Sequence, residues 1–281
     1  MDYLRLLRPH QWIKNVFVLF PLFISGILAP SINWQGLALC FASFCLASSA
    51  VYVVNDIFDA DRDRQHPVKK TRPIANGAVS EVEGWAIASV LALVAGTLAH
   101  LASPSTLSFV IAYVVLNLIY SSWTKHIPLM DCTSIALGFC LRFLAGGVGF
   151  GIPINPQLLA SCYFGALAMA LIKRRIELSG STEPVKSSRP SLKGLSLPVL
   201  DLLVGIFTAT AIMLYAQWTM MAARPIAIFT LPFLSILFSR IVWLAYLNKK
   251  GEDFSKTLLL DGFALFSTAL FFASLGFAIY A

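Results

Sequence analysis

Charge is scarce in this sequence. Charged residues make up 12% of its 281 residues and hydrophobic residues 58%, with a mean hydropathy of +0.76. Soluble domains carry about 25% charged residues, so this chain has too few polar side chains to cover a globular surface of its size. A freely soluble protein is therefore excluded, and much of the surface must face lipid.

Two other features are missing. Residues Met1 to Arg8 lack the short apolar region and small-residue cleavage site of a secretory signal peptide. We therefore expect the first apolar stretch to be retained as a helix. The five cysteines are odd in number and show no metal-ligand spacing, which favours small hydrophobic side chains in packed helices over a cysteine metal site.

Apolar stretches follow one another along the chain. A bilayer core about 30 Å thick needs about 20 apolar residues per helix. We predict an all-α polytopic membrane protein with nine transmembrane helices in a single domain, residues 1–281. The first span is expected to extend back through an amphipathic lead-in from Arg8 to Asn15. The nine spans are expected at residues 16–30, 36–54, 84–102, 105–122, 130–150, 157–172, 199–221, 226–246 and 258–280.

The basic residues predict the orientation of these spans. Of the 21 lysines and arginines, eighteen fall in loops on one side, two lie within spans and Arg224 falls on the other side. By the positive-inside rule, the amino terminus and the large loops are cytoplasmic and the carboxyl terminus lies outside. The net charge of +7 then reflects topology and anionic lipid, and we expect no nucleic-acid partner.

Aspartates gather directly after the second predicted span, in the run NDIFDADRD (residues 55–63). If the helix continues, Asp56, Asp59 and Asp63 share one face within about 60° of arc, whereas Asp61 points nearly the opposite way. Like charges on one face repel each other, and a bound divalent cation removes that repulsion. Hard oxygen ligands favour Mg²⁺, held by carboxylates together with substrate phosphates. We therefore predict Mg²⁺ as the cofactor.

Cations follow the aspartates closely, in the run RQHPVKKTRP (residues 64–73), which leads to Asn76 and Gly77. Acidic and then basic residues suit a diphosphate, because carboxylates hold the metal while cations take the remaining phosphate oxygens. A solvated loop with mutual salt bridges is the plainer alternative. That alternative gives no reason for three acids on one helical face.

The run NDIFDADRD followed by TRPIANG (residues 71–77) resembles the NDxxDxxxD motif and following Arg-Pro of the UbiA-type intramembrane prenyltransferase superfamily. Nine helices with the acidic motif at the cytoplasmic end of the second are also similar to that family. The resemblance covers essentially the whole chain. It implies a UbiA-like bundle around a cavity open to the cytoplasmic side, in a bacterial inner (plasma) membrane.

One branch of that superfamily fits this chain better than the others. Members that transfer prenyl groups carry a second aspartate-rich motif near helix six, where this chain has KRRIE (residues 173–177). The segments RPHQWIKN (8–15) and YAQW (215–218) also resemble the decaprenyl-phosphate phosphoribosyltransferase branch. The resemblance implies transfer of 5-phosphoribose from phosphoribosyl diphosphate to a polyprenyl (decaprenyl-type) phosphate, with release of diphosphate. The three anionic groups of these substrates need more cations and fewer carboxylates than one prenyl diphosphate does.

The residues predicted to form the site fall into two sets. Asp56, Asp59 and Asp63 are the expected metal ligands and catalytic carboxylates, with Asp63 acting directly or through water. His66 has an alternative role as a hydrogen-bonding residue of the loop. Tyr120 has an alternative role as a member of the aromatic belt at the membrane surface. The residues expected to bind substrate are Gln11, Lys14, Asn55, His66, Lys69, Arg72, Tyr120, Lys125, Arg142, Lys173, Arg174 and Glu177.

Three more of these predictions have open alternatives. Lys14, on one face of an interfacial helix with Gln11, can grip the acceptor phosphate or simply anchor the helix to anionic lipid. Arg142, inside a span, lines a polar cavity or pairs with a buried acid. Lys173 and Glu177 fit substrate binding or an ordinary helix-end salt bridge.

Two rival functions are kept. An aromatic prenyltransferase making a quinone precursor uses a prenyl diphosphate donor, and it needs the second acidic motif. A transporter places polar sites near the membrane midplane, whereas the charges here gather at one face. The expected partners are polyprenyl phosphate, phosphoribosyl diphosphate and the lipid bilayer, and the sequence is compatible with a homo-oligomer.

Overall fold

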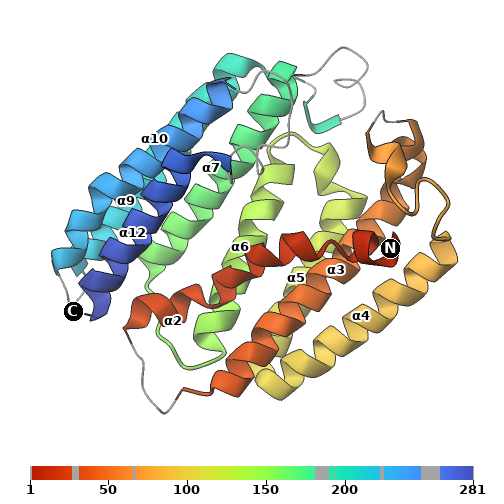
Figure 1. The fold of residues 1–281 in the computed structure, drawn as a ribbon, viewed down its shortest axis with the longest axis horizontal. Coiled ribbons are helices and arrows are strands. Elements are labelled where there is room, and N and C mark those ends of the chain that lie inside the picture. Colours follow the sequence, from red (N-terminus) through yellow and green to blue (C-terminus); the bar gives the residue numbers. More distant parts are fainter. Residues whose placement is uncertain are drawn as a thin grey trace. The chain divides into compact units, whose positions relative to one another are not determined.

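The computed structural model describes residues 2–26, 32–65, 68–180, 190–192, 194–221, 225–247 and 260–280. Every element assigned within these ranges is a helix (Figure 1), as predicted. The α-helices are α1 Asp2–Leu7, α2 Phe20–Ser25, α3 Trp34–Gln65, α4 Glu81–Ala102, α5 Pro104–Ser122, α6 Met130–Val148, α7 Pro156–Gly180, α9 Leu197–Met221, α10 Leu231–Leu247 and α12 Gly262–Tyr280. The 3-10 helices are η1 Pro9–Val18, η2 Lys69–Thr71, η3 Thr124–His126, η4 Pro190–Leu192 and η5 Pro225–Thr230.

Eight helices in the described ranges are long and apolar enough to cross a membrane, and they match the second to ninth predicted spans. The first predicted span differs, because its described part is η1 followed by the six-residue α2. Pro9 and Pro21 have no backbone N–H to donate within a continuous α-helix. Gly26, with a φ of 66°, then ends α2 in the left-handed conformation.

The chain forms two compact units. The first consists of Met1–Lys125 and Gly138–Ile154, and the second of His126–Leu137 and Asn155–Ala281. The beginning of α6 therefore belongs to the second unit and the rest of α6 to the first. The single domain expected from the sequence stays a prediction.

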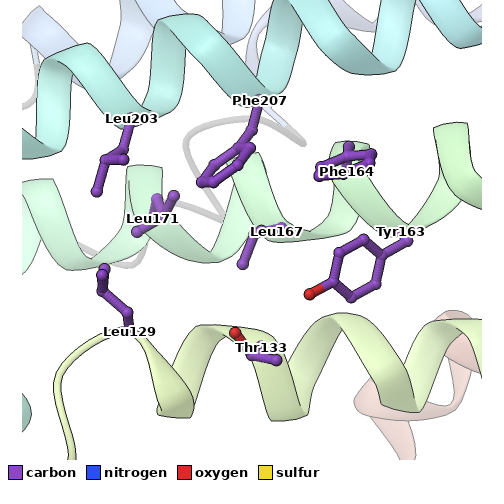
Figure 2. A pocket seen from close by; sticks show the side chains of 8 residues that line it. All are labelled: Leu129, Thr133, Tyr163, Phe164, Leu167, Leu171, Leu203 and Phe207. Atoms are coloured by element: carbon purple, nitrogen blue, oxygen red, sulfur yellow. The ribbon is translucent and has the colours of Figure 1, made fainter.

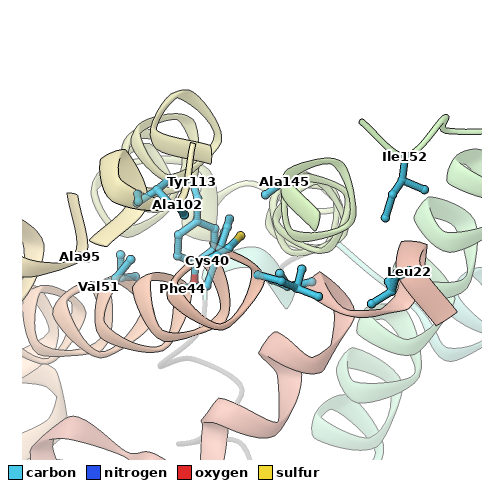
Figure 3. Packing of buried hydrophobic residues seen from close by; sticks show 14 residues of the cluster. Leu22, Cys40, Phe44, Val51, Ala95, Ala102, Tyr113, Ala145 and Ile152 are labelled. Carbon is cyan, nitrogen blue, oxygen red and sulfur yellow. The ribbon is translucent and has the colours of Figure 1, made fainter. Parts of the chain in front are cut away.

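In the first unit, α3 packs lengthwise against α4. Small side chains on α4 let the two backbones approach closely, as is typical of membrane helices. Cys40 and Phe44 of α3 and Tyr113 of α5 belong to the hydrophobic cluster around this contact (Figure 3). The buried residues of α4 are Gly84, Ala88, Ala95, Ala99 and Ala102.

The helix α3 positions the site, because it continues beyond the predicted end of its span at residue 54 as far as Gln65. The loop that follows is held against it by apolar contacts. Ile74 and Val79, each 1% exposed, belong to one buried cluster with Val53 and Ala60 of α3. The basic loop therefore lies along the acidic end of the helix.

In the second unit, α7 packs against α9. Leu171 of α7 and Leu200 and Val204 of α9 are buried in its hydrophobic cluster. Ile172 and Ile176 belong to the same cluster, so the charged end of α7, residues 173–177, packs against it on one side.

Candidate active site

The acidic face predicted on α3 is formed. The side chains of Asp56, Asp59 and Asp63 expose 2%, 18% and 4% of their surface, whereas that of Asp61 exposes 92%. The helix continues through these positions, so residues at i, i+3 and i+7 lie on its packed side. An ionised carboxylate in such a place requires a counter-charge.

A single guanidinium nitrogen bridges two of these acids. Arg72 Nη1 donates to Asp56 Oδ1 at 3.0 Å and to Asp63 Oδ2 at 2.6 Å. Arg72 directly follows the 3-10 helix η2 and caps it, because its backbone N–H bonds the Lys69 carbonyl while its own backbone is extended. The loop therefore turns this side chain back onto α3.

A second arginine reaches the same carboxylate from the amino-terminal segment. Arg8 Nη2 donates to Asp56 Oδ1 at 2.6 Å, and the guanidinium lies over the Tyr52 ring, 5.2 Å from its centroid. Arg8 has a left-handed backbone, with φ 50° and ψ 57°, which is uncommon for a residue other than glycine. Sequence reasoning missed Arg8 as a site residue. The signal that could have found it is the need of a buried Asp56 for a cation.

Lys125 and Asn55 hold the third acid. Lys125 Nζ donates to Asp59 Oδ1 at 2.9 Å, and Asn55 Nδ2 donates to Asp59 Oδ2 at 3.2 Å. Ser121 Oγ donates to Asn55 Oδ1 at 3.3 Å and so fixes the orientation of the amide. With Arg72, three of the residues predicted to bind substrate are thus gathered on the acidic face, the other two being Asn55 and Lys125.

We call this set the α3 cluster; its members are Asp56, Asp59, Asp63, Arg8, Arg72 and Lys125. One acceptor in it is left over, because Asp56 Oδ2 is buried and has no hydrogen-bond partner among the described residues. Within the described ranges, no three His, Cys, Asp or Glu side chains are arranged as ligands of one ion. The oxygen donors nevertheless suit a hard divalent cation, and Asp56 Oδ2 is an acceptor left without a partner there.

Arg142 lies in a different setting within the first unit. Its side chain donates to Asn15 Oδ1 at 2.7 Å, to the Gly138 carbonyl at 2.8 Å and to Tyr113 Oη at 2.9 Å. Among the described residues no carboxylate pairs with it, so of the two alternatives left open by the sequence, the pairing with a buried acid is not the one that the structure shows. Asn15 is itself fully buried, and Arg142 therefore ties η1 to α6 and α5.

In the second unit, Arg174 is held by two acids. Its Nε donates to Asp131 Oδ2 and its Nη1 to Glu177 Oε2, both at 2.6 Å. The side chains of Arg174 and Asp131 are 2% and 1% exposed, whereas Lys173 is exposed. We name Arg174, Asp131 and Glu177 the α7 cluster. The sequence did not indicate Asp131 as the acid that meets Arg174.

Another ion pair of the second unit joins Arg240 of α10 to Asp261, the residue directly before α12. Asp261 accepts hydrogen bonds from Arg240 at 2.6 and 3.0 Å and from the Ala264 backbone N–H at 2.7 Å. The bonds from the Arg240 guanidinium, followed by that from Ala264, hold the pKa of Asp261 below its usual range. Asp261 thereby acts as the N-terminal cap of α12.

The remaining predicted residues lie on three elements or outside the described ranges. Gln11 and Lys14 are three residues apart on η1, which places them on the same side of a 3-10 helix. Lys69 in η2 and Tyr120 near the end of α5 are half-buried. His66 lies outside the described residues. Substrate binding by these residues stays a prediction.

The second unit also contains an apolar cavity of about 350 Å³ lined by α6, α7 and α9 (Figure 2). Its wall consists mainly of leucine and phenylalanine side chains, such as Phe164, Leu167 and Phe207. Thr133 and Tyr163 carry the two side-chain oxygens of the lining. Such a lining suits an apolar ligand.

These features define a multi-pass membrane protein with a buried site of carboxylates, arginines and lysine at the end of a long helix, a composition suited to phosphorylated ligands. Comparison with known proteins identifies the family. Residues 18–275 match the UbiA prenyltransferase family, and the chain belongs to it.

Individual relatives agree with this assignment. The chain is 35% identical to a decaprenyl-phosphate phosphoribosyltransferase of Corynebacterium glutamicum over 76% of its own length and 66% of that protein's. It is 32% identical to the protein of the same name from Mycolicibacterium smegmatis, over 81% of this chain and 73% of that one. The fold is similar to that of a UbiA homologue from Archaeoglobus fulgidus bound to DMAPP and Mg²⁺. There the TM-score is 0.76 at 21% identity, over 100% of this chain and 99% of that one.

Proposed function

We propose that this protein is a membrane-embedded, Mg²⁺-dependent transferase that moves 5-phosphoribose from phosphoribosyl diphosphate to a polyprenyl phosphate. The observation that carries the proposal is the α3 cluster, in which carboxylates suited to a metal meet cations suited to phosphate. The names of its relatives from Corynebacterium and Mycolicibacterium support the same reaction.

Asp56, Asp59 and Asp63 are the residues that would hold Mg²⁺. The unpartnered Oδ2 of Asp56 and the oxygen-only donor set fit this ion. When bound, Mg²⁺ would withdraw negative charge from the leaving diphosphate. Asn55 would keep Asp59 oriented through the hydrogen bond between their side chains.

The cations would take the phosphate oxygens. Arg72, Lys125 and Arg8 already point at the carboxylates and could contact a diphosphate bound there. Lys69, in the same loop as Arg72, is assigned to the diphosphate or the 5-phosphate. His66, Tyr120, Arg142, Lys173, Arg174 and Glu177 remain proposed substrate contacts without a more specific role.

The acceptor would be gripped near the membrane surface. Gln11 and Lys14 lie on η1, with Lys14 exposed, where a lipid phosphate can reach them. The orientation proposed from the lysines and arginines is a cytoplasmic amino terminus and site, in a bacterial inner membrane. The cavity around the site would open to the same side.

The reaction needs positioning more than proton transfer. The bond between ribose C1 and the diphosphate oxygen breaks with both electrons leaving on diphosphate, and a phosphate oxygen of the acceptor bonds to C1 from the opposite face. A phosphate monoester with a second pKa of about 6 is already mostly dianionic at pH 7, so no strong general base is required. Arginines and lysines that balance the developing charge then supply most of the acceleration.

The alternative is a transferase that uses a prenyl diphosphate and an aromatic acceptor. The end of α7 argues against it, because Lys173, Arg174 and Arg175 stand where such enzymes are expected to carry acids. The test is to incubate the purified protein with Mg²⁺, polyprenyl phosphate and phosphoribosyl diphosphate, and to identify the lipid product by mass spectrometry. A parallel reaction contains prenyl diphosphate and 4-hydroxybenzoate.

We expect polyprenyl phosphoribosyl phosphate in the first reaction, lost on addition of EDTA and restored by excess Mg²⁺. A prenylated aromatic product in the second reaction, with none in the first, would overturn the proposal. Uptake of solutes into liposomes containing the protein, without either product, would indicate a transporter instead.

A further inference from the structure

The bridging nitrogen of Arg72 bears on the order in which ligands enter the site. We propose that Arg72 and a divalent cation exclude each other from Asp56 and Asp63, so that the cation binds together with a diphosphate and not by itself. This inference rests on the proposed function, because it concerns the same carboxylates and the same donor group.

The geometry sets up the exclusion. Arg72 Nη1 lies 3.0 Å from Asp56 Oδ1 and 2.6 Å from Asp63 Oδ2, two acids that are two turns apart on α3. A cation shared by these two oxygens would stand where the nitrogen stands, and the two positive charges would repel each other. The arginine must leave before a cation can bridge the pair.

Charge balance decides when the arginine leaves. The α3 cluster pairs three acids with three basic residues, and the more exposed Arg62 adds a longer contact of 3.7 Å to Asp59. The Arg72 and Arg8 side chains are only 24% and 19% exposed, so a guanidinium displaced by a metal alone would remain partly desolvated without its acceptor, which is unfavourable. A diphosphate supplies new acceptors, because its oxygens take charge-assisted hydrogen bonds from arginine.

Asp56 is the carboxylate at which arginine and cation would be exchanged. Its Oδ1 accepts from both Arg8 and Arg72, whereas its Oδ2 has no partner among the described residues. A diphosphate draws the guanidinium groups to its own oxygens, and the cation that arrives with it can then bind the carboxylates that they leave, including the unpartnered Oδ2 of Asp56. In this exchange no carboxylate is left unpaired.

Two ligands that favour each other in this way are thermodynamically coupled. Each raises the affinity of the other by the same factor. The test therefore measures binding and not turnover. Purified full-length protein in lipid nanodiscs is titrated with Mn²⁺, and the unbound ion is followed by electron paramagnetic resonance, with and without inorganic pyrophosphate. Nanodiscs without protein correct for the complex that forms in solution.

For the wild type we expect Mn²⁺ to bind at least about tenfold more tightly when pyrophosphate is present. Arg72→Gln should shift the two measurements in opposite directions. Mn²⁺ alone should bind about tenfold more tightly than to the wild type, since two carboxylates lose their bridging cation, and pyrophosphate should bind about tenfold more weakly in the presence of metal. A residue that contacts only phosphate would leave the first value unchanged, and a purely structural residue would weaken both.

Two further variants make the result interpretable. Arg8→Gln removes the other cation from Asp56 but leaves the Arg72 bridge in place, so Mn²⁺ alone should bind it less tightly than it binds Arg72→Gln. Arg64→Gln is the matched control, because Arg64 pairs with the exposed Asp61 and should change neither value.

Equal Mn²⁺ affinity with and without pyrophosphate in the wild type overturns the exchange. Unchanged or weaker binding of Mn²⁺ alone to an Arg72→Gln variant that unfolds at the wild-type temperature also overturns it. If Arg72→Gln does not fold, the wild-type comparison with and without pyrophosphate decides. These outcomes leave the proposed function standing if the wild type still forms the phosphoribosyl lipid. Absence of that product overturns the proposed function, and the metal titration still decides the exchange.

Discussion

Each of the two units buries a cluster of charged side chains. The two clusters differ in how exposed their arginines are and in whether a hydrogen-bond acceptor is left without a partner. In the α7 cluster, Arg174 and Asp131 are almost fully enclosed and Glu177 takes a further donor of the arginine. In the α3 cluster, Arg8 and Arg72 are partly exposed and Asp56 Oδ2 has no partner among the described residues. Buried charge alone therefore does not identify a site. We expect loss of the enclosed cluster to act first on stability, whereas the partly open cluster with an unmet acceptor can exchange its contacts for a ligand.

The largest effect on activity should come from Asp56, the acid of the α3 cluster that both arginines contact. Asp56→Asn removes one charge while preserving the shape of the side chain, and phosphoribosyl transfer should fall at least about a thousandfold. Transfer is measured with labelled phosphoribosyl diphosphate, and thermal unfolding checks the fold. Asp61→Asn, on the exposed side of the same helix, should stay close to the wild-type rate. If Asp56→Asn kept the wild-type rate, the α3 cluster would not be the site of the reaction, and its contrast with the α7 cluster would have no functional meaning.

In the α7 cluster the expected loss is in stability. Arg174→Gln leaves Asp131 buried without its cation, which should lower the free energy of unfolding by about 3–5 kcal/mol. Thermal unfolding in nanodiscs measures this loss. Lys173→Gln, at the exposed neighbour, is the control and should unfold like the wild type. If Arg174→Gln keeps its stability but raises the KM for the donor, substrate binding by Arg174 is supported and the contrast between the clusters is wrong.

Arg142 should give an intermediate effect. Arg142→Gln removes the bonds to Asn15 Oδ1 and Tyr113 Oη. The carbonyl oxygen of the buried Asn15 is then left unpaired, which costs about 1–3 kcal/mol. The free energy of unfolding should fall accordingly, with Arg142→Lys falling between this variant and the wild type. Unchanged stability together with a raised KM for either substrate would instead support the predicted contact between Arg142 and substrate.

The smallest effect concerns Asp261, outside both clusters. Its pKa is held below the ordinary value of 3.8, chiefly by Arg240. A lowered pKa means that the stabilising interaction is complete above pH 3.8 and is lost as the pH falls through the pKa of the folded state. Arg240→Gln should therefore unfold slightly earlier than the wild type at pH 7, and the difference should vanish in acid. A difference that persists in acid would show that Arg240 acts through other contacts.

Local patterns predicted what depends on neighbours along the chain. The apolar stretches gave eight of the spans, and the spacing of Asp56, Asp59 and Asp63 placed them on one side of α3, as the structure shows. Pairing across long sequence separations was beyond such reasoning. Arg8 meets Asp56 48 residues away, and Arg174 meets Asp131 43 residues away.

The conformation of the first segment was also missed. Apolar composition indicates burial in lipid but does not distinguish an α-helix from a 3-10 helix, and ten residues of 3-10 helix in η1 exceed the usual three or four. Contacts with other helices hold the segment in this form. Asn15 bonds Ser48 and Arg142, and a side chain at Gly146 would meet the Val18 carbonyl oxygen at 1.7 Å.

The left-handed backbone at Arg8 is a conformation that glycine adopts without steric cost. For a larger residue such a backbone is a store of conformational energy, of order 1–3 kcal/mol, that the rest of the structure has to offset. Glycine at position 8 would relieve this backbone cost, but it would also take away the cation that Arg8 gives to the buried Asp56. The strained peptide unit and the buried ion pair are therefore linked, and neither can be removed without changing the other.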